Sequence, residues 1–229
     1  MIFPGAGQGA LMLPFLMLAA ACQQPASASE RIVEAPAATT PARESPGLKK
    51  AIFAGGCFWG VEGVFSHVKG VKSAVSGYHG GSSTDADYRT VSSGGTRHAE
   101  AVKVIYDPAQ VRYDQLLRIF FSVIADPTLK NRQGPDVGPQ YRAALVPLGA
   151  EQRKVAAAYL EQIGKSGLWD KPVVTRMEKP RKFYAAEDYH QDFMLKNPQH
   201  GYILRWDAPK VAGLKQLYPD FYKPGFTRN

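Results

Sequence analysis

The sequence predicts an α+β fold, with a ferredoxin-like split βαβ core followed by a loop-rich C-terminal extension. Two observations support this prediction. Between about residues 50 and 146, apolar runs typical of strands alternate with helix-spaced apolar residues in the order β-α-β-β-α-β. Beyond that point the chain adds one further helix and strand and then becomes rich in loops and aromatic residues.

The first predicted strand covers residues 50–55 and leads into a helix that begins near Cys57. The apolar residues of that helix recur at helical spacing, and they are Val61, Val64, Phe65 and Val68. Two more strands are predicted at residues 71–79 and 99–106, and a Gly/Ser-rich loop separates them.

A second amphipathic helix follows, and its apolar positions are Leu116, Leu117, Phe120, Phe121 and Ile124. Residues 141–146 are predicted to form the last strand of the core. A helix at about 151–164 and a strand near 172–177 extend this core.

Residues 1–29 have the features of an export signal. The apolar stretch at 10–21 is too short to span a membrane, and polar, Pro- and Ala-rich sequence follows it. The residues that end at Cys22 resemble a bacterial lipoprotein signal, whose cysteine is lipidated, while cleavage after Ala28 is the alternative. We therefore expect export to the bacterial periplasm, or anchoring to the membrane as a lipoprotein through Cys22.

Residues 30–48 are predicted to form a flexible linker, because this Pro-, Ala-, Ser- and Thr-rich stretch has few large apolar residues. Residues 49–229 then form a single folded domain, which we expect to be a monomer. The formal net charge is +8, but the Lys and Arg residues are dispersed, so no nucleic-acid partner is expected. The histidines lack metal-ligand spacing, and no metal site or bound cofactor is predicted.

The segment Ala54–Gly60 places Cys57 at the turn from strand to helix. At a helix N-terminus, unpaired N–H groups and the positive end of the dipole stabilise a thiolate, so a lowered thiol pKa and a nucleophilic sulfur are expected. The glycines would leave the sulfur reachable. The alternative is a buried, inert structural cysteine.

Glu100 is the second candidate for chemistry. Alternation along the strand at 99–106 places it on the same side as Val102, Val104 and Tyr106. Burial would raise the pKa of this carboxyl and make it a proton donor near neutral pH. The alternative is a structural ion pair with Arg97 or His98.

Three further polar residues lie in predicted loops. Tyr88 and Tyr141 could supply hydroxyl donors to an oxygen that develops charge, although such tyrosines more often serve in packing. Asp136 lies in a Gly- and Pro-rich stretch where the default role is a turn former.

As a set, these residues resemble the A-type peptide methionine sulfoxide reductases over roughly residues 50–225. The matching motifs are Gly56-Cys57-Phe58-Trp59-Gly60, Tyr88, His98-Ala99-Glu100, Asp126-Pro127-Thr128, Asn131, Gln133-Gly134, Asp136, Gln140-Tyr141-Arg142, Tyr184, Glu187-Asp188-Tyr189-His190-Gln191, Asn197-Pro198 and Gly201-Tyr202.

The resemblance implies reduction of the S epimer of methionine sulfoxide, free or in oxidised proteins and peptides, with Cys57 as the nucleophile that becomes a sulfenic acid. Glu100 would protonate the leaving oxygen, and the hydroxyls of Tyr88 and Tyr141 would bond to it.

In the same resemblance, Phe58 and Trp59 would form an apolar pocket for the substrate methyl group, and Asp136 would help to organise the site. Tyr202 matches a position of the family to which we assign no catalytic role.

The chain departs from many members of this family because it has no cysteine after Cys57. The resemblance therefore implies that an external thiol regenerates Cys57, either a thioredoxin-like or glutaredoxin-like protein or a small dithiol. Arg97 stands where glycine is common in the family and Ala125 where histidine is common. A guanidinium pointing at Glu100 would lower the pKa of that carboxyl.

Two other classes of function remain open from the sequence. One is a thiol hydrolase in which a histidine activates Cys57. The other is a binding lipoprotein with an inert Cys57, for which slow alkylation at neutral pH would be the sign.

Overall fold

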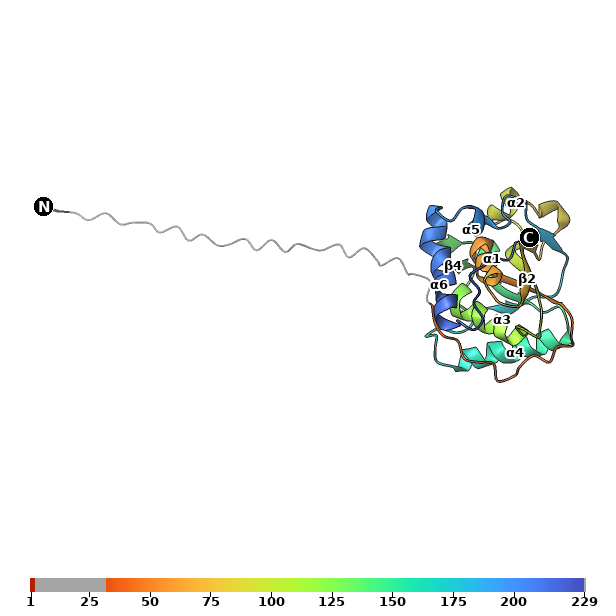
Figure 1. Cartoon of the computed structure of the whole chain (residues 1–229). Helices are drawn as coiled ribbons and strands as arrows, with labels where there is room; N and C mark the ends of the chain where they lie inside the picture. Colours follow the sequence, from red (N-terminus) through yellow and green to blue (C-terminus); the bar gives the residue numbers. More distant parts are fainter. Residues whose placement is uncertain (3–31, 229) are drawn as a thin grey trace.

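A six-stranded sheet forms the centre of the domain (Figure 1). The structure is a computed structural model and describes residues 1–2 and 32–228. Its four core strands are β1 (Lys49–Gly55), β2 (Val71–His79), β3 (Ala99–Tyr106) and β6 (Ala143–Val146). They lie in the order β6-β1-β3-β2, and each neighbouring pair is antiparallel. β1 and β2 are therefore parallel with β3 between them, which confirms the predicted split βαβ core.

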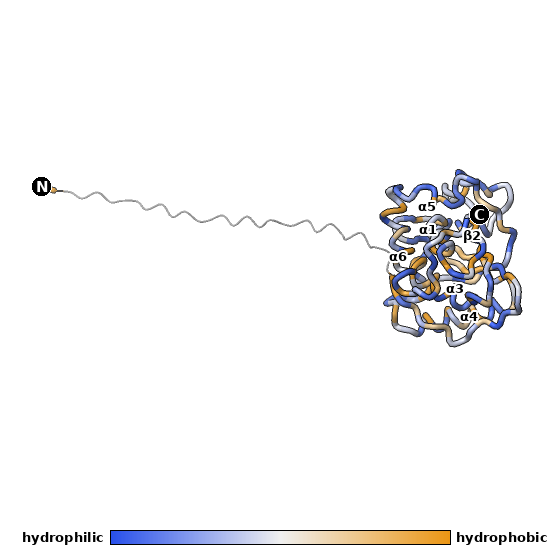
Figure 2. The backbone as a smooth tube through the Cα atoms, in the orientation of Figure 1, coloured by the Kyte–Doolittle hydropathy of each residue, from blue (hydrophilic) through white to orange (hydrophobic). Residues whose placement is uncertain are grey.

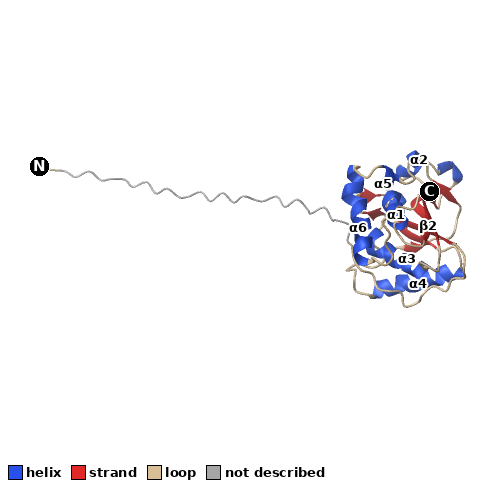
Figure 3. Cartoon of the chain, viewed as in Figure 1, coloured by secondary structure: helices blue, strands red, loops and turns tan. Residues whose placement is uncertain are grey.

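Two short strands widen this sheet. β7 (Arg176–Met177) pairs in parallel with β6, and β8 (Phe183–Ala185) pairs antiparallel with β2. A separate hairpin consists of β4 (Arg132–Gln133) and β5 (Asp136–Val137). In the view of Figure 3 helices lie at the left, top and bottom of the domain, and strands lie between them.

The α-helices are α1 (Phe58–Ser66), α2 (Tyr88–Ser92), α3 (Tyr113–Ile119), α4 (Ala150–Lys165), α5 (Phe193–Lys196) and α6 (Ala208–Leu217). Two 3₁₀ turns cover Ser83–Asp85 and Pro139–Tyr141, and two π-helical turns cover Phe120–Ile124 and Ile203–Asp207.

An aromatic cluster joins β1 to helices α1 and α3. The Phe53 ring lies 4.8 Å from that of Phe65, 5.4 Å from Phe120 and 6.0 Å from Tyr113, measured between centroids. All four side chains are fully buried. Hydrophobic and hydrophilic stretches alternate along the chain (Figure 2), and the buried apolar side chains of β1, α1 and α3 belong to one core. Truncation of a phenylalanine at such a position costs about 3–5 kcal/mol, so this cluster fixes how α1 sits on the sheet.

Most of the predicted helices and strands are present. The differences occur in short turns and short helices, which apolar periodicity does not indicate. The strands at 71–79 and 99–106 have the predicted bounds. The Gly/Ser-rich loop between them contains the short helix α2, which apolar spacing does not reveal. The strand predicted at 141–146 begins at Ala143, because the preceding residues form a 3₁₀ turn. Of the strand predicted near 172–177, only Arg176–Met177 pairs.

The structure contradicts the prediction of a flexible linker at 30–48. Its described part, from residue 32, lies along the domain rather than apart from it. Ala35 and Ala42 are buried, and their backbone N–H groups donate to Ser122 Oγ at 3.0 Å and to Asp114 Oδ1 at 2.9 Å. The small side chains of this segment allow its backbone to approach the domain closely, and polar side chains of the domain satisfy its N–H groups, which composition alone does not reveal.

Glu44 fastens the same segment near its C-terminal end. Its carboxylate accepts a hydrogen bond from the Tyr106 hydroxyl at 2.5 Å and one from the backbone N–H of Tyr113 at 2.9 Å. The segment therefore connects β3 and the start of α3, and it forms part of the folded domain.

The predicted export signal, including Cys22, lies outside the described residues. Within residues 1–2 and 32–228, none of the helices has the length and apolar character needed to cross a membrane.

Candidate active site

Cys57 lies between the end of β1 and the start of α1, as the sequence predicts, and it is the N-cap residue of that helix. Two glycines precede it in a tightly packed turn. A Cβ atom on Gly55 would lie 2.7 Å from the Phe120 ring, and one on Gly56, whose φ is +88°, would lie 2.6 Å from Gln133 Cβ. Only glycine fits at these positions. The turn presents Cys57 with 9% of its surface exposed.

The expected lowering of the thiol pKa is wrong for this structure. Burial raises the pKa of Cys57 well above its usual value, because it penalises the thiolate. The negative charges of Glu100, Asp207 and Asp136 act in the same direction. The backbone N–H of Trp59 does bond to the sulfur and favours the thiolate, as a helix N-terminus should, but this effect is smaller. In the resting state the sulfur is therefore a thiol.

Glu100 is buried on the core side of β3, with 2% of its surface exposed. Burial raises its pKa to about 8, against the lowering effect of a hydrogen bond from the backbone N–H of Phe58 to Oε2 at 2.9 Å. The charges of Asp136 and Asp207 raise it further. At neutral pH the Glu100 carboxyl is therefore mostly protonated. The Arg97 side chain is exposed and is not among the groups that shift this pKa.

Tyr88 and Tyr141 reach the same site from different elements. Tyr88 begins α2, and its backbone N–H donates to Glu187 Oε1 at 2.8 Å. Tyr141 ends the 3₁₀ turn before β6. Burial raises the pKa of both hydroxyls, and the charges of Glu100 and Cys57 raise them further. Both tyrosines therefore keep their protons and can donate hydrogen bonds.

Asp136 lies on the hairpin strand β5 and receives a short hydrogen bond from the Tyr202 hydroxyl. Burial raises the pKa of this carboxyl, whereas the Tyr202 bond and the charge of Lys210 lower it. The hairpin is thus joined to the C-terminal part of the domain at the site. Tyr202 matches a position of the family and was expected to have no catalytic role, and its bond with Asp136 forms only when the hairpin packs against the C-terminal part of the chain.

The two aromatic residues after Cys57 differ in their exposure. The Trp59 ring is partly buried and stacks on Phe193 with centroids 3.7 Å apart, and the Tyr202 ring meets its edge at 5.9 Å. Phe58 is 1% exposed and packs 5.0 Å from the His190 ring. Trp59 therefore offers apolar surface at the site, whereas Phe58 lies in the core, and both rings pack near His190.

The loop before α5 supplies contacts that sequence reasoning missed. Besides holding Tyr88, Glu187 accepts a hydrogen bond from the Tyr78 hydroxyl at 2.8 Å. His190 Nδ1 accepts from Trp59 Nε1 at 3.1 Å, so the histidine nearest this tryptophan orients an aromatic ring. Glu187 and His190 belong to the motif Glu187-Asp188-Tyr189-His190-Gln191, but a loop has no periodicity that would indicate their contacts.

Buried charges under α1 were also missed. Lys210 Nζ lies 3.3 Å from Asp207 Oδ1, and both side chains are almost completely buried. A Cβ atom on Gly60 would lie 2.2 Å from the same Asp207 oxygen. On the same helix Glu62 is buried, accepts from Ser76 Oγ at 2.9 Å and from the backbone N–H of Asp192 at 3.0 Å, and burial raises its pKa to about 7. A glycine in the first helical turn is the only sequence signal for this packing.

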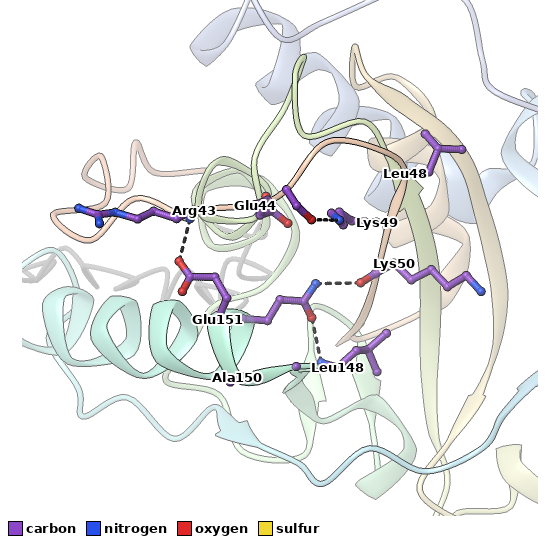
Figure 4. Close-up of a pocket in the computed structure, with 11 residues that line it drawn as sticks. Arg43, Glu44, Leu48, Lys49, Lys50, Leu148, Ala150 and Glu151 are labelled. Atoms are coloured by element: carbon purple, nitrogen blue, oxygen red, sulfur yellow. Dashed lines mark hydrogen bonds between the residues drawn. The ribbon is translucent and has the colours of Figure 1, made fainter.

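Within residues 1–2 and 32–228, no group of three or more His, Cys, Asp or Glu side chains is arranged to hold a metal ion. A cavity of about 510 Å³ lies between the start of β1 and the N-terminus of α4, and none of the candidate residues lines it (Figure 4). Glu151 in its wall accepts a hydrogen bond from the backbone N–H of Arg43. This cavity is therefore separate from the site around Cys57.

Similarity to known proteins covers most of the domain. The family described as peptide methionine sulfoxide reductase matches residues 49–219. The peptide methionine sulfoxide reductase MsrA 2 of Mesorhizobium japonicum is 53% identical over 180 residues, which cover 79% of this chain and 92% of that protein. A protein of the same name from Synechocystis is 51% identical and covers 77% and 83%.

Two solved structures agree with these similarities. Reduced Mxr1 from Saccharomyces cerevisiae has a TM-score of 0.61 and 32% identity, covering 69% of this chain and 91% of that one. Methionine sulfoxide reductase A of Corynebacterium diphtheriae has a TM-score of 0.56 and 31% identity, covering 73% and 92%.

Proposed function

The chain belongs to the A-type peptide methionine sulfoxide reductases, and from this premise we propose that it reduces the S epimer of methionine sulfoxide, free or in proteins, to methionine. The observation that carries the proposal is a buried Glu100 with a pKa of about 8, hydrogen-bonded to the residue after Cys57. Oxide is a poor leaving group until it is protonated. A neutral carboxyl near a nucleophilic sulfur supplies the missing proton.

In the proposed reaction the Cys57 sulfur attacks the sulfur of the substrate. The sulfur–oxygen bond of the sulfoxide breaks and the oxygen ends on Cys57, so a thiol becomes a sulfenic acid while a sulfoxide becomes a sulfide. Both changes involve two electrons, and they balance. Glu100 gives its proton to the oxygen, and the thiol proton replaces it on Glu100.

This scheme accommodates the raised pKa of Cys57. A protonated Glu100 carries no charge, so one of the groups that disfavour the thiolate is neutral when substrate arrives. Thiol deprotonation is then linked to proton transfer from Glu100 and does not require a free thiolate in the resting enzyme. Slow alkylation of Cys57 at neutral pH is consequently expected for the active reductase, and it does not indicate an inert thiol.

The remaining candidate residues have matching roles in the proposal. The hydroxyls of Tyr88 and Tyr141, which keep their protons, donate hydrogen bonds to the sulfoxide oxygen as charge develops on it. Trp59 receives the substrate methyl group, and Phe58 packs with it near His190. Asp136 organises the edge of the pocket through its bond with Tyr202.

An external thiol is proposed to regenerate the enzyme. Cys57 is the only cysteine among residues 32–228, and Ile203, which follows Tyr202, is 1% exposed. The sulfenic acid therefore has no thiol within the domain to condense with. A thioredoxin-like or glutaredoxin-like protein, or a small dithiol, would form a mixed disulfide with Cys57 and release it by exchange.

We also propose that the protein is exported and works as a monomer in the bacterial periplasm or at the membrane, where it repairs oxidised envelope proteins. The support is the pattern of residues 1–29, with lipidation at Cys22 or cleavage near Ala28 as its two versions. Mass spectrometry of the protein isolated from both the membrane and the soluble envelope fractions distinguishes them, because a lipidated Cys22 would be the N-terminal residue of the first version only.

A single turnover without reductant tests the reaction. Purified protein is mixed with each separated epimer of a methionine sulfoxide peptide, and methionine and the modification of Cys57 are measured by mass spectrometry. We expect about one methionine per protein from the S epimer only, with a sulfenic acid on Cys57 that a dimedone reagent traps.

Two variants serve as controls. Cys57→Ser should form no methionine, whereas Cys22→Ser should behave as the wild type because Cys22 is outside the domain. Methionine from neither epimer, or equal yields from Cys57→Ser and wild type, would contradict the proposed reaction.

A further inference from the structure

Arg142 uses all five of its N–H donors in hydrogen bonds. Its Nε donates to Glu178 Oε1 at 2.6 Å, and one Nη2 hydrogen donates to Glu178 Oε2 at 3.2 Å. Nη1 donates to the backbone carbonyls of His98 at 3.1 Å and Pro139 at 2.9 Å. The other Nη2 hydrogen reaches the carbonyl of Arg97 at 3.1 Å. Because the five donors are fixed in one plane, the side chain cannot shift without breaking several bonds.

The three carbonyls belong to two chain segments. One carries Glu100, the proposed proton donor, and the other carries Tyr141, whose hydroxyl is a proposed hydrogen-bond donor. Residues 97–98 directly precede β3, and Glu100 is the second residue of that strand. Pro139 begins the 3₁₀ turn that ends at Tyr141. One planar cation therefore fixes the segment of Glu100 relative to the segment of Tyr141.

Glu178 anchors the guanidinium to the sheet. His79 Nδ1 lies 3.4 Å from Glu178 Oε2, and His79 Nε2 accepts from the backbone N–H of Arg181 at 3.2 Å. The ring proton of His79 is therefore on Nδ1, facing the carboxylate. Burial alone would raise the pKa of Glu178, but its bonds with His79 and Arg142 bring it down to about 2. The anchor stays charged at every pH at which the protein would work.

Gly80 keeps the approach to the carbonyl open. Its φ is +107°, and a Cβ atom there would lie 2.8 Å from the Arg97 carbonyl oxygen and 3.0 Å from Arg142 Nη2. A side chain at this position would meet the guanidinium and the carbonyl that it binds. The local backbone is thus shaped for this contact.

We propose that Arg142 is a positioning residue that holds the Glu100 carboxyl and the Tyr141 hydroxyl at one mutual geometry around the sulfoxide oxygen. The proposal rests on the proposed function, because it assigns a role within that reaction. Arg142 acts through its backbone partners and not on the reacting atoms. A displacement of about 1 Å in such a geometry lowers a rate on the order of 10²-fold.

Chemical rescue is the sharpest test, because Arg142 and Glu178 line a cavity of about 670 Å³ through which a small cation can enter. The rate of methionine formation in a single turnover is measured for Arg142→Ala, alone and with low-millimolar guanidinium chloride or ethylammonium chloride. We expect Arg142→Ala to be about 100-fold slower than wild type. Guanidinium should raise the single-turnover rate of Arg142→Ala at least about tenfold. Ethylammonium, which lacks the planar donors, should not raise it.

Arg142→Lys and a matched control complete the design. Lysine keeps the charge but cannot make five bonds, so we expect at least about a tenfold slower turnover and a displaced alkaline limb in the pH profile. A loss of stability alone would lower the rate by a similar factor at every pH and would leave the position of the alkaline limb unchanged. Arg118→Ala is the control, since Arg118 is similarly exposed and bonds to the carbonyl of Ala35 and the carboxylate of Glu34, away from the candidate residues. It should keep the wild-type rate within about twofold.

The outcomes separate this inference from the function on which it rests. A folded Arg142→Ala that turns over at the wild-type rate, or that guanidinium does not restore, overturns the positioning role. If Arg142→Ala does not fold, a wild-type rate and pH profile in Arg142→Lys overturn it equally. Absence of methionine from the wild-type protein would instead refute the proposed function.

Discussion

The substitution Glu100→Gln should change how stability depends on pH, as well as abolish most activity. The folded protein holds the Glu100 proton up to about pH 8, whereas the unfolded chain releases it near 4.5. The folded state therefore loses stability as the pH rises through this window, because the unfolded state gains by releasing the proton earlier. Glutamine resembles the protonated acid in shape, can accept the Phe58 N–H through its carbonyl, and does not titrate.

The magnitude follows from the two pKa values. For a single group with these values, the wild type loses about 2.5 kcal/mol of stability relative to Glu100→Gln between pH 5 and pH 7, and a total of about 4–5 kcal/mol by pH 9. Glu62, with a pKa of about 7, contributes a similar trend to both proteins and cancels in the difference.

Urea unfolding of wild type and Glu100→Gln at pH 5, 7 and 9 measures this difference. The two free energies of unfolding should be close at pH 5, and the variant should be the more stable protein at pH 9. Single-turnover reduction by the variant should be slow at every pH, whereas that of the wild type should fall above about pH 8 as Glu100 ionises. A stability difference that does not change with pH would mean that Glu100 titrates normally, and its assignment as the acid would then be wrong.

Three other substitutions test separate parts of the structure. Trp59→Ala removes the ring that stacks at 3.7 Å in the pocket, and it should raise the KM for a methionine sulfoxide peptide by about tenfold or more; an unchanged KM would exclude this pocket. Gly60→Ala places a Cβ atom 2.2 Å from Asp207 Oδ1 and should cost about 1–3 kcal/mol in urea unfolding, whereas Gly225→Ala, where a Cβ atom meets nothing within 4 Å, should be nearly neutral; equal stabilities would contradict the packing of α1. Glu44→Ala leaves two donors without their acceptor and should cost about 1–3 kcal/mol with the single-turnover rate unchanged, and a wild-type urea midpoint would show that residues 32–48 do not need this contact.

Strand periodicity made much of the core predictable. The alternation at 99–106 placed Glu100 on the same face as Val102, Val104 and Tyr106, and in the structure all four side chains are buried. A register error of one residue would have turned this set to the opposite face of the sheet. The position of Cys57 also followed from local sequence, since a strand, two glycines and a helix leave few geometries for the turn.

The thiol pKa could not be predicted from the same local features. The helix N-terminus is a property of residues 57–60, but the larger effects come from burial and from carboxylates distant in sequence. Asp136 and Asp207 reach Cys57 only after the hairpin and the C-terminal helices have packed. Electrostatics of this kind depend on the whole fold, which a linear pattern does not contain.

If the protein is anchored through Cys22 as proposed, the docked segment at 32–48 limits how far the domain can lie from the membrane. Ile32 lies only ten residues after Cys22, and a chain of that length spans at most ~36 Å. A tether that continued to Lys49 would reach ~95 Å. The shorter reach would keep the enzyme within about one protein diameter of the bilayer, so that oxidised proteins at the membrane surface would be its nearest substrates.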